Sequence, residues 1–273
     1  MTDPGARQAI AGLYTGEGWP DGGDELLARS LSPRSHDMLL EVPGWLGLGA
    51  GQLVLDAGCR DGRWAVELAE RYGCRVVGVD LVLAGAPKRG RFDAARVGDQ
   101  VALLRGDIEA LPLASDICDL VWCRDTLSCL PDCATALREC ARVLRPGGGM
   151  VLYAVFTAET LAPGDRALVV DALENSAASM DQATVEAAIA AAGLQVVRRE
   201  RIGSEWTEHW LEEDPAYLTR DLLEIARLVR DQERMEAALG RTWYRRALAF
   251  DLWRLQIALG RLVPHVYALA KPA

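Results

Sequence analysis

The stretch Leu53-Val54-Leu55-Asp56-Ala57-Gly58-Cys59-Arg60-Asp61-Gly62 decides the fold of this chain. An apolar run that ends in an acid, followed by small residues and an amphipathic segment at 63–72, predicts a buried strand, a tight turn and a helix. Gly58 lacks a Cβ and can let the backbone approach a ligand, and Gly62 suits a turn into the helix. Asp56 would stand at the carboxyl end of the strand, where open α/β sheets bind ligands. The spacing leaves two interpretations open, a ligand site and a turn whose glycines are purely geometric.

The composition excludes several classes of protein. The 273 residues are half apolar and carry a formal net charge of −9, which argues against a broad nucleic-acid surface and favours a small uncharged or cationic substrate. Residues 1–19 hold no apolar core of a signal peptide, and no run approaches the ~20 apolar residues of a membrane span. We therefore expect a cytoplasmic protein with neither a membrane nor a nucleic-acid partner.

The seven cysteines are odd in number and include no C-x-x-C pair, which predicts reduced thiols. The closest group is Cys129, Cys133 and Cys140. Free cysteine is most often a small buried hydrophobe, so we expect no metal site.

From residue 52 onward, strand-like runs alternate with helix-like runs. We expect strands at 52–57, 74–80, 100–106, 117–123 and 149–156, with helices at 62–72, near 87–97 and at 132–144. This alternation is typical of βαβ units and a parallel sheet.

Residues 1–50 precede this pattern and hold two expected short helices, 24–31 and 35–41. The segment is either a lid over a site or a cover for the sheet. Tyr14 and Trp19 are its candidates for contact with a substrate.

A second acid, Asp80, ends the second expected strand about 20 residues beyond the glycine turn, the usual place of an acid that accepts hydrogen bonds from ribose hydroxyls. The alternative is a surface aspartate that caps the next helix. The first motif favours the ribose role. Further on stand Gly106-Asp107-Ile108-Glu109-Ala110-Leu111-Pro112 and Arg142-Val143-Leu144-Arg145-Pro146-Gly147-Gly148.

These blocks, over roughly residues 50–157, resemble the class I S-adenosylmethionine-dependent methyltransferases, most closely the small-molecule enzymes of the ubiquinone and menaquinone type. The resemblance implies S-adenosyl-L-methionine as cofactor. It implies that Asp56, Gly58 and Cys59 line the methionine end and that Asp80 binds the ribose. The other implied contacts are Leu81 beside the adenine, Asp107 and Ile108 at its amino group and ring, and Arg124 beside the methyl-donor pocket.

The chain departs from the family pattern at two positions. Arg60 replaces a usual glycine, so its side chain must point away from the cofactor or lie along it. Cys129 stands where many relatives carry a histidine, so a base often found after the fourth strand is absent.

The resemblance also implies a doubly wound, mostly parallel seven-stranded sheet with an antiparallel last strand. We expect a helix at 181–192, a sixth strand at 194–202 and the last strand at 262–270. The predicted divisions are an N-terminal lid or cover (1–50), the cofactor-binding core (51–202), a helical substrate cap (203–261) and the final strand of the core (262–273).

So long an insertion before the last strand is usually functional. Apolar residues at helical spacing predict two antiparallel helices in it, which bury themselves against the sheet or a second subunit and would also cover the acceptor pocket.

The insertion begins with the most polar and aromatic segment of the chain, residues 204–214. Trp206 and Trp210 would share a helix face, and carboxylates beside indoles would suit an amine or sulfonium group. The alternative is a solvated acidic helix start. His209 is the first candidate for a general base, since an imidazole titrates near neutral pH, whereas His36 and His265 are expected to be structural.

Together these features predict transfer of a methyl group to an O, N or C atom of a small molecule, which is consistent with a secondary metabolite. Two alternatives stay open: a non-catalytic protein of the same fold that acts as a partner or scaffold, and an enzyme of this fold with other chemistry. A homodimer is a further expectation.

Overall fold

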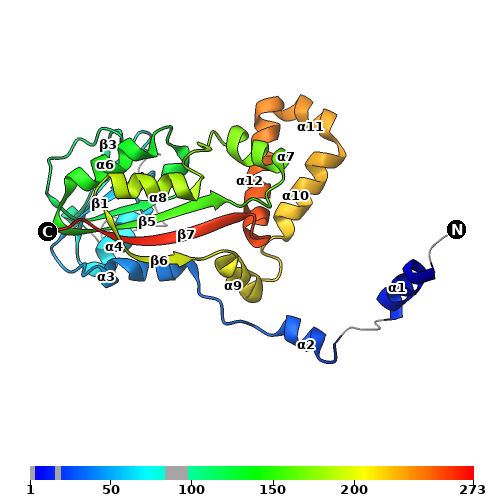
Figure 1. Cartoon of the computed structure of the whole chain (residues 1–273). Coiled ribbons are helices and arrows are strands. Elements are labelled where there is room, and N and C mark those ends of the chain that lie inside the picture. The colour runs from blue at the N-terminus through cyan, green and yellow to red at the C-terminus, as the bar shows by residue number, and fades with distance from the viewer. Residues whose placement is uncertain (1–3, 16–19, 84–97) are drawn as a thin grey trace. The chain divides into compact units, whose positions relative to one another are not determined.

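The computed structural model describes residues 4–15, 20–83 and 98–273 and divides the chain into two compact units, 1–33 and 34–273 (Figure 1). The first unit contains α1 (Pro4–Thr15) and α2 (Gly23–Ala28). Trp19, the side chain of Tyr14 and the helix expected near 87–97 lie outside the described residues.

The second unit is built on one seven-stranded sheet in the order β3-β2-β1-β4-β5-β7-β6. Its strands are β1 (Leu53–Ala57), β2 (Arg75–Asp80), β3 (Val101–Arg105), β4 (Cys118–Arg124), β5 (Leu144–Thr157), β6 (Gln195–Arg201) and β7 (Leu262–Ala270). β7 runs antiparallel to both of its neighbours, and the other pairs are parallel. The α/β fold with a mostly parallel sheet and an antiparallel last strand is thus confirmed.

Helices cover both faces of the sheet (Figure 1). On one face lie η1 (His36–Glu41), α3 (Val42–Trp45) and α4 (Arg63–Tyr72), and on the other α6 (Cys133–Val143) and α8 (Gln182–Ala191). Neighbouring strand residues point to opposite faces, so Val54 packs in the α4 core with Leu68, whereas Leu55 packs in the α6 core with Leu137. Asp56 and Trp122 are paired across β1 and β4 and therefore share the α4 face.

Four helices stand between β6 and β7, two more than the apolar spacing predicted. They are α9 (Glu205–Glu213), α10 (Thr219–Arg230), α11 (Gln232–Leu239) and α12 (Arg241–Ala258). The helices are separated by Asp214-Pro215, by Asp231 with φ −133°, and by Gly240 with φ 78°. α12 packs on α10, on α11 and on η4 (Leu168–Ala172), which α7 (Pro163–Ala167) precedes.

The inserted helices α10, α11 and α12 lie beyond the end of β5, at the carboxyl edge of the parallel strands (Figure 1). They share a small core of Leu228, Tyr244 and Leu248. Among the described residues, no helix combines the length and apolar character needed to cross a membrane. All seven cysteines fall within the described part of the chain and are free, and only Cys129 is exposed.

Candidate cofactor and substrate site

The turn after β1 is held in left-handed backbone at three positions, Gly58 (φ 85°), Arg60 (φ 51°) and Gly62 (φ 75°). Arg60 thus adopts the conformation that the missing glycine would favour. Its side chain is exposed, and its backbone N–H donates to Asp80 Oδ2 at 2.8 Å. The substitution therefore preserves the shape of the turn and places the guanidinium in solvent.

Gly58 is also required by a contact within the fold itself. An added Cβ would lie 2.2 Å from Thr126 Oγ1, which is within hydrogen-bond distance of the carbonyl oxygens of Ala57 and Arg124. The space beside Gly58 is thus occupied by Thr126, which ties the end of β1 to the end of β4.

The Cys59 side chain is buried against β2. Its Sγ would lie 2.8 Å from a Cβ added at Gly78, and burial raises the pKa of its thiol to about 12. Cys59 therefore offers only its backbone to the turn.

Three acids stand in a row along the carboxyl edge of the sheet, because the strand order places β3, β2 and β1 side by side. Asp80 ends β2 and accepts backbone N–H groups from Arg60 and Val82, each at 2.8 Å. Asp107 follows β3, and its Oδ1 accepts the Glu109 N–H at 2.8 Å. Carboxylate oxygens that accept one N–H keep lone pairs for further donors.

The apolar residues expected beside these acids have different environments. Ile108 is buried, whereas the Leu81 side chain is exposed. Both follow an acid at the strand edge, so both stand next to the row.

Asp56 is the third acid of the row and the most unusual. It is buried, and its Oδ2 has no hydrogen-bond partner among the described residues. Burial, followed by repulsion from Asp80, raises the pKa of Asp56 to about 7. A buried acceptor without a donor is costly, so a cationic donor from a ligand would be stabilised here.

A cavity of about 440 Å³ lies next to this edge, on the α4 face of the sheet. Trp206 forms one wall and stacks on Tyr153, with ring centroids 5.2 Å apart and planes 9° apart. Trp210 stacks between His36 at 5.5 Å and Tyr217 at 5.8 Å. The structure thus brings both predicted substrate tryptophans into one cavity.

His36 belongs to this cavity, although the sequence suggested a structural role. Its Nδ1 is buried without a hydrogen-bond partner among the described residues, and burial lowers the pKa of the imidazole. His209 lies on α9, half-buried, with its ring edge-on to Trp210 at 5.8 Å, and it is not part of the cavity lining.

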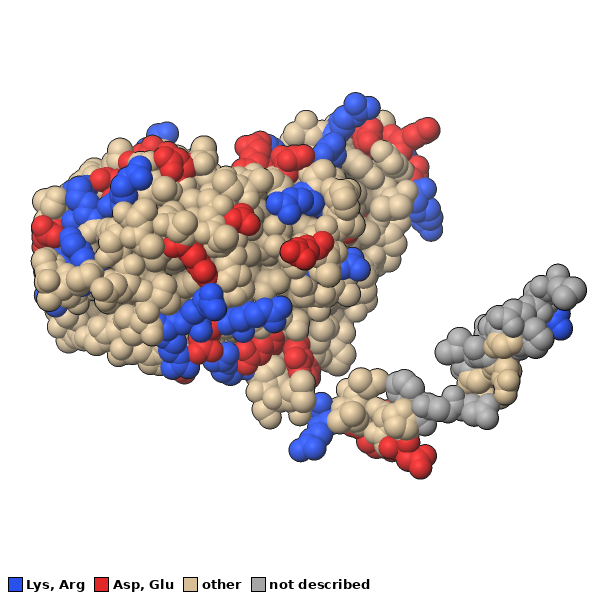
Figure 2. Space-filling model, in the orientation of Figure 1, with Lys and Arg blue, Asp and Glu red and all other residues tan. Residues whose placement is uncertain are grey.

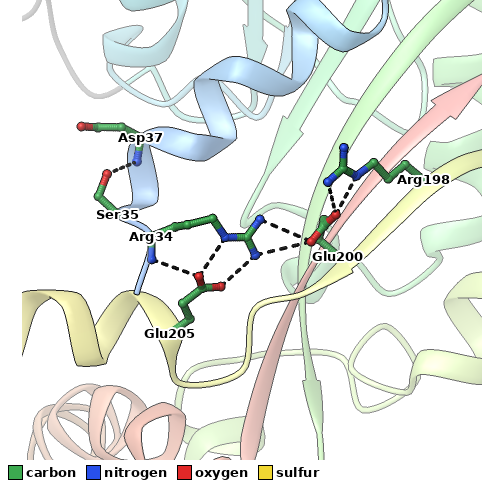
Figure 3. Close-up of polar contacts among 6 residues, drawn as sticks. All are labelled: Arg34, Ser35, Asp37, Arg198, Glu200 and Glu205. Carbon is green, nitrogen blue, oxygen red and sulfur yellow. Dashed lines mark hydrogen bonds and ion pairs between the residues drawn. The ribbon is translucent and has the colours of Figure 1, made fainter. Parts of the chain in front are cut away.

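Arg34, two residues before His36, is bonded to α9 (Figure 3). Its guanidinium donates two hydrogen bonds of 2.8 Å to Glu205, and its backbone N–H donates a third of 3.0 Å. It also reaches Glu200 of β6, which Arg198 holds from the other side. This network joins the segment before η1 to the first turn of α9, and it uses Glu205, one of the carboxylates expected to serve a cationic ligand.

Arg124, the last residue of β4, links the acidic edge to the cavity. Its guanidinium carbon lies 4.2 Å from the centre of the Trp64 ring, and that of Arg63 lies 4.4 Å from the same centre. Both arginines line the cavity.

Comparison with known proteins gives relatives for the central part of the chain. Residues 55–152 match a family model described as a methyltransferase domain. Residues 55–152 therefore resemble a methyltransferase domain. A methyltransferase named GfsG from Streptomyces halstedii is 31% identical over 150 residues, covering 52% of this chain and 51% of the relative. The 27-O-demethylrifamycin SV methyltransferase of Amycolatopsis mediterranei is 34% identical over 112 residues, covering 41% of each chain. The matched part of the chain thus spans about half the length of these relatives or less.

The overall fold has solved counterparts. The structure of a putative sarcosine dimethylglycine methyltransferase from Galdieria sulphuraria aligns with a TM-score of 0.64 at 16% identity, over 86% of this chain and 84% of that one. The structure of a geranyl diphosphate methyltransferase in complex with S-adenosylmethionine aligns with a TM-score of 0.62 at 18% identity, over 86% of this chain and 83% of that one.

The acids at the carboxyl edge fit this cofactor. Asp56 offers one carboxylate oxygen, Oδ2, without a partner among the described residues for an ammonium group, and Asp80 and Asp107 offer acceptors for hydroxyl and amino donors. Among the described residues, no three His, Cys, Asp or Glu side chains come together as metal ligands.

Proposed function

We propose that this protein is an S-adenosylmethionine-dependent methyltransferase that acts on an O, N or C atom of a small molecule. The observation that carries the proposal is the row of Asp56, Asp80 and Asp107 next to the aromatic cavity. Arg124 stands between the row of acids and the cavity, so a methyl donor held by the acids would face the cavity.

The chemistry needs little from the protein beyond position and exclusion of water. The bound cofactor supplies an electrophilic sulfonium methyl group, which is displaced in line by the acceptor. Trp206 and Tyr153 provide an apolar wall for the acceptor, and the Arg34 network holds α9 over it.

The insertion 203–261 is proposed to act as the substrate cap, with residues 51–202 and 262–273 as the cofactor-binding core and 1–50 as a lid or cover. α9 supplies Trp206 and Trp210, and α12 supplies Arg254 and Ile257, to the cavity lining. A homodimer and a cytoplasmic location also stay predictions. On the face shown in Figure 2, basic and acidic side chains are interspersed, which supports a small-molecule partner over a nucleic acid.

The test is transfer of label from methyl-labelled S-adenosylmethionine to candidate acceptors, with release of S-adenosylhomocysteine. A methylated product supports the proposal. Absence of cofactor binding would favour the non-catalytic alternative. An altered acceptor formed without S-adenosylhomocysteine would favour other chemistry on the same fold.

If the acceptor is a hydroxyl, we expect His36 to serve as the general base, since its neutral imidazole lines the cavity. A base contributes roughly 100-fold or more to the rate, so His36→Gln should lower the transfer rate by about that factor. Burial lowers the pKa of His36 below the ordinary histidine value of 6.5. The wild-type rate should therefore fall only when the pH drops below 6.5. The variant should lose this acidic limb of the pH–rate profile.

His209→Gln is the matched variant on the neighbouring helix, and it tests the base predicted from the sequence. We expect it to keep the acidic limb and most of the rate. Loss of the limb in His209→Gln and its persistence in His36→Gln would instead assign the base to His209.

A further inference from the structure

We infer that the acceptor bound in the aromatic cavity carries an oxyanion, a carboxylate or a phosphate, on an apolar body. This inference deepens the proposed function and rests on it. The net charge of the chain favours an uncharged or cationic substrate, but the local charge of the cavity is of the opposite sign.

The cavity lining contains three arginines and one carboxylate. The arginines are Arg63, Arg124 and Arg254, and the carboxylate belongs to the exposed Asp214, whose Oδ1 accepts the N–H of Ala216 at 3.0 Å. His36 adds an imidazole. The lining is therefore cationic although the protein is acidic overall.

Arg254 is already neutralised. Its Nε donates to Asp221 Oδ2 at 2.6 Å, its Nη2 donates to the other oxygen of the same carboxylate, and Asp251 lies 3.6 Å away. The Arg254–Asp221 pair thus resembles the Arg34–Glu205 pair, in which the guanidinium also has a carboxylate within hydrogen-bond distance.

Arg63 and Arg124 differ from these paired arginines. The nearest carboxylate oxygen to Arg63 Nε belongs to Glu67 at 3.6 Å, and that to Arg124 Nε belongs to Asp125 at 3.8 Å. Both distances exceed hydrogen-bond length, and neither Nε has a hydrogen-bond partner among the described residues. The guanidiniums of Arg63 and Arg124, which both lie over the Trp64 ring, therefore keep N–H donors for an oxyanion.

The carboxylates of the α9 segment do not offset this charge. Glu205 is bound to Arg34, and Glu208 and Glu212 line a separate depression with Leu211 and Ala258. The expected amine or sulfonium ligand therefore meets the carboxylate of Asp214 but not those of Glu205, Glu208 and Glu212 in the cavity lining. Trp206, Trp210 and Tyr153 are suited instead to the apolar body of an anionic acceptor.

Calorimetry with four naphthalene probes tests the inference on the full chain in the presence of S-adenosylhomocysteine. Naphthalene-2-carboxylate and 2-naphthyl phosphate carry the two oxyanions, naphthalene-2-carboxamide is the neutral isostere, and 2-naphthylmethylammonium is the cation. We expect at least one oxyanion to bind about tenfold or more tightly than the amide. The oxyanion probe that binds more tightly shows whether the acceptor carries a carboxylate or a phosphate.

Arg63→Gln and Arg124→Gln should each reduce this preference, and Arg75→Gln, an exposed arginine at the opposite end of β2, should leave it unchanged. Tighter binding of the cation, equal binding of the amide, or no binding of either oxyanion would overturn the inference. Failure of the proposed function would appear separately, as absence of S-adenosylhomocysteine binding in the same instrument.

Discussion

Gly58→Ala is expected to destabilise the protein by roughly 2–4 kcal/mol, because it combines left-handed backbone with a clash. The new Cβ would lie within 2.2 Å of Thr126 Oγ1 at φ 85°. Displacement of Thr126 would also break its contacts with the ends of β1 and β4 and move the acidic edge. Urea unfolding measures the stability, and calorimetry with S-adenosylhomocysteine measures the effect on the site.

Gly51→Ala is the matched control for Gly58→Ala. Gly51 has nearly the same φ, 76°, but nothing lies within 4 Å of the added Cβ. Gly51→Ala should lower the free energy of unfolding by only about 1 kcal/mol, which is the cost of placing alanine in left-handed backbone. Equal losses in the two variants would mean that contact with Thr126 is not what requires glycine at position 58.

Asp80→Ala is expected to weaken binding of S-adenosylhomocysteine about 100-fold, since hydrogen bonds to a charged group are worth roughly 1.5–3 kcal/mol each. The substitution removes the proposed ribose acceptors and the carboxylate that receives the N–H groups of Arg60 and Val82. Asp80→Asn keeps one acceptor oxygen and should bind with intermediate affinity.

The control for Asp80 is Asp99→Ala, an exposed acid in η2 (Gly98–Gln100) at the amino end of β3. It changes the net charge equally and should leave the affinity unaltered. If Asp80→Ala bound the ligand as tightly as wild type, the ribose role of this acid would be wrong.

The sheet was predictable because its signals are local. The last strand was placed at 262–270 and is observed there, and the expected helix start at 181 matches the N-cap Asp181, which accepts the Thr184 N–H. β5 begins earlier than expected, at Leu144, because Leu144 already pairs with Cys118 across a register shift before Gly149. A Pro-Gly-Gly run carries no sign of such pairing in the sequence.

The site was only partly predictable because its cavity depends on distant contacts. The acids at 56, 80 and 107 follow strands, so their common edge is implied by the alternation of elements. His36 stacks on Trp210 beside the Arg34–Glu205 bonds, and both contacts join residues far apart in the chain. The cationic lining likewise arises from Arg63 on α4 and Arg124 on β4, which meet at Trp64. No local pattern indicates either arrangement.

Calorimetric titration of the wild-type protein with S-adenosylhomocysteine at pH 6, 7 and 8 tests the central claim most directly. The pKa of Asp56 is raised to about 7, so its carboxyl is largely protonated at pH 6 and ionised at pH 8. An ammonium group favours the ionised form, so the affinity should rise about tenfold over this range, with release of about half a proton at pH 7. Asp56→Asn should abolish this dependence. Saturable binding with that pH dependence is the predicted result, and absence of binding at all three pH values would contradict the account.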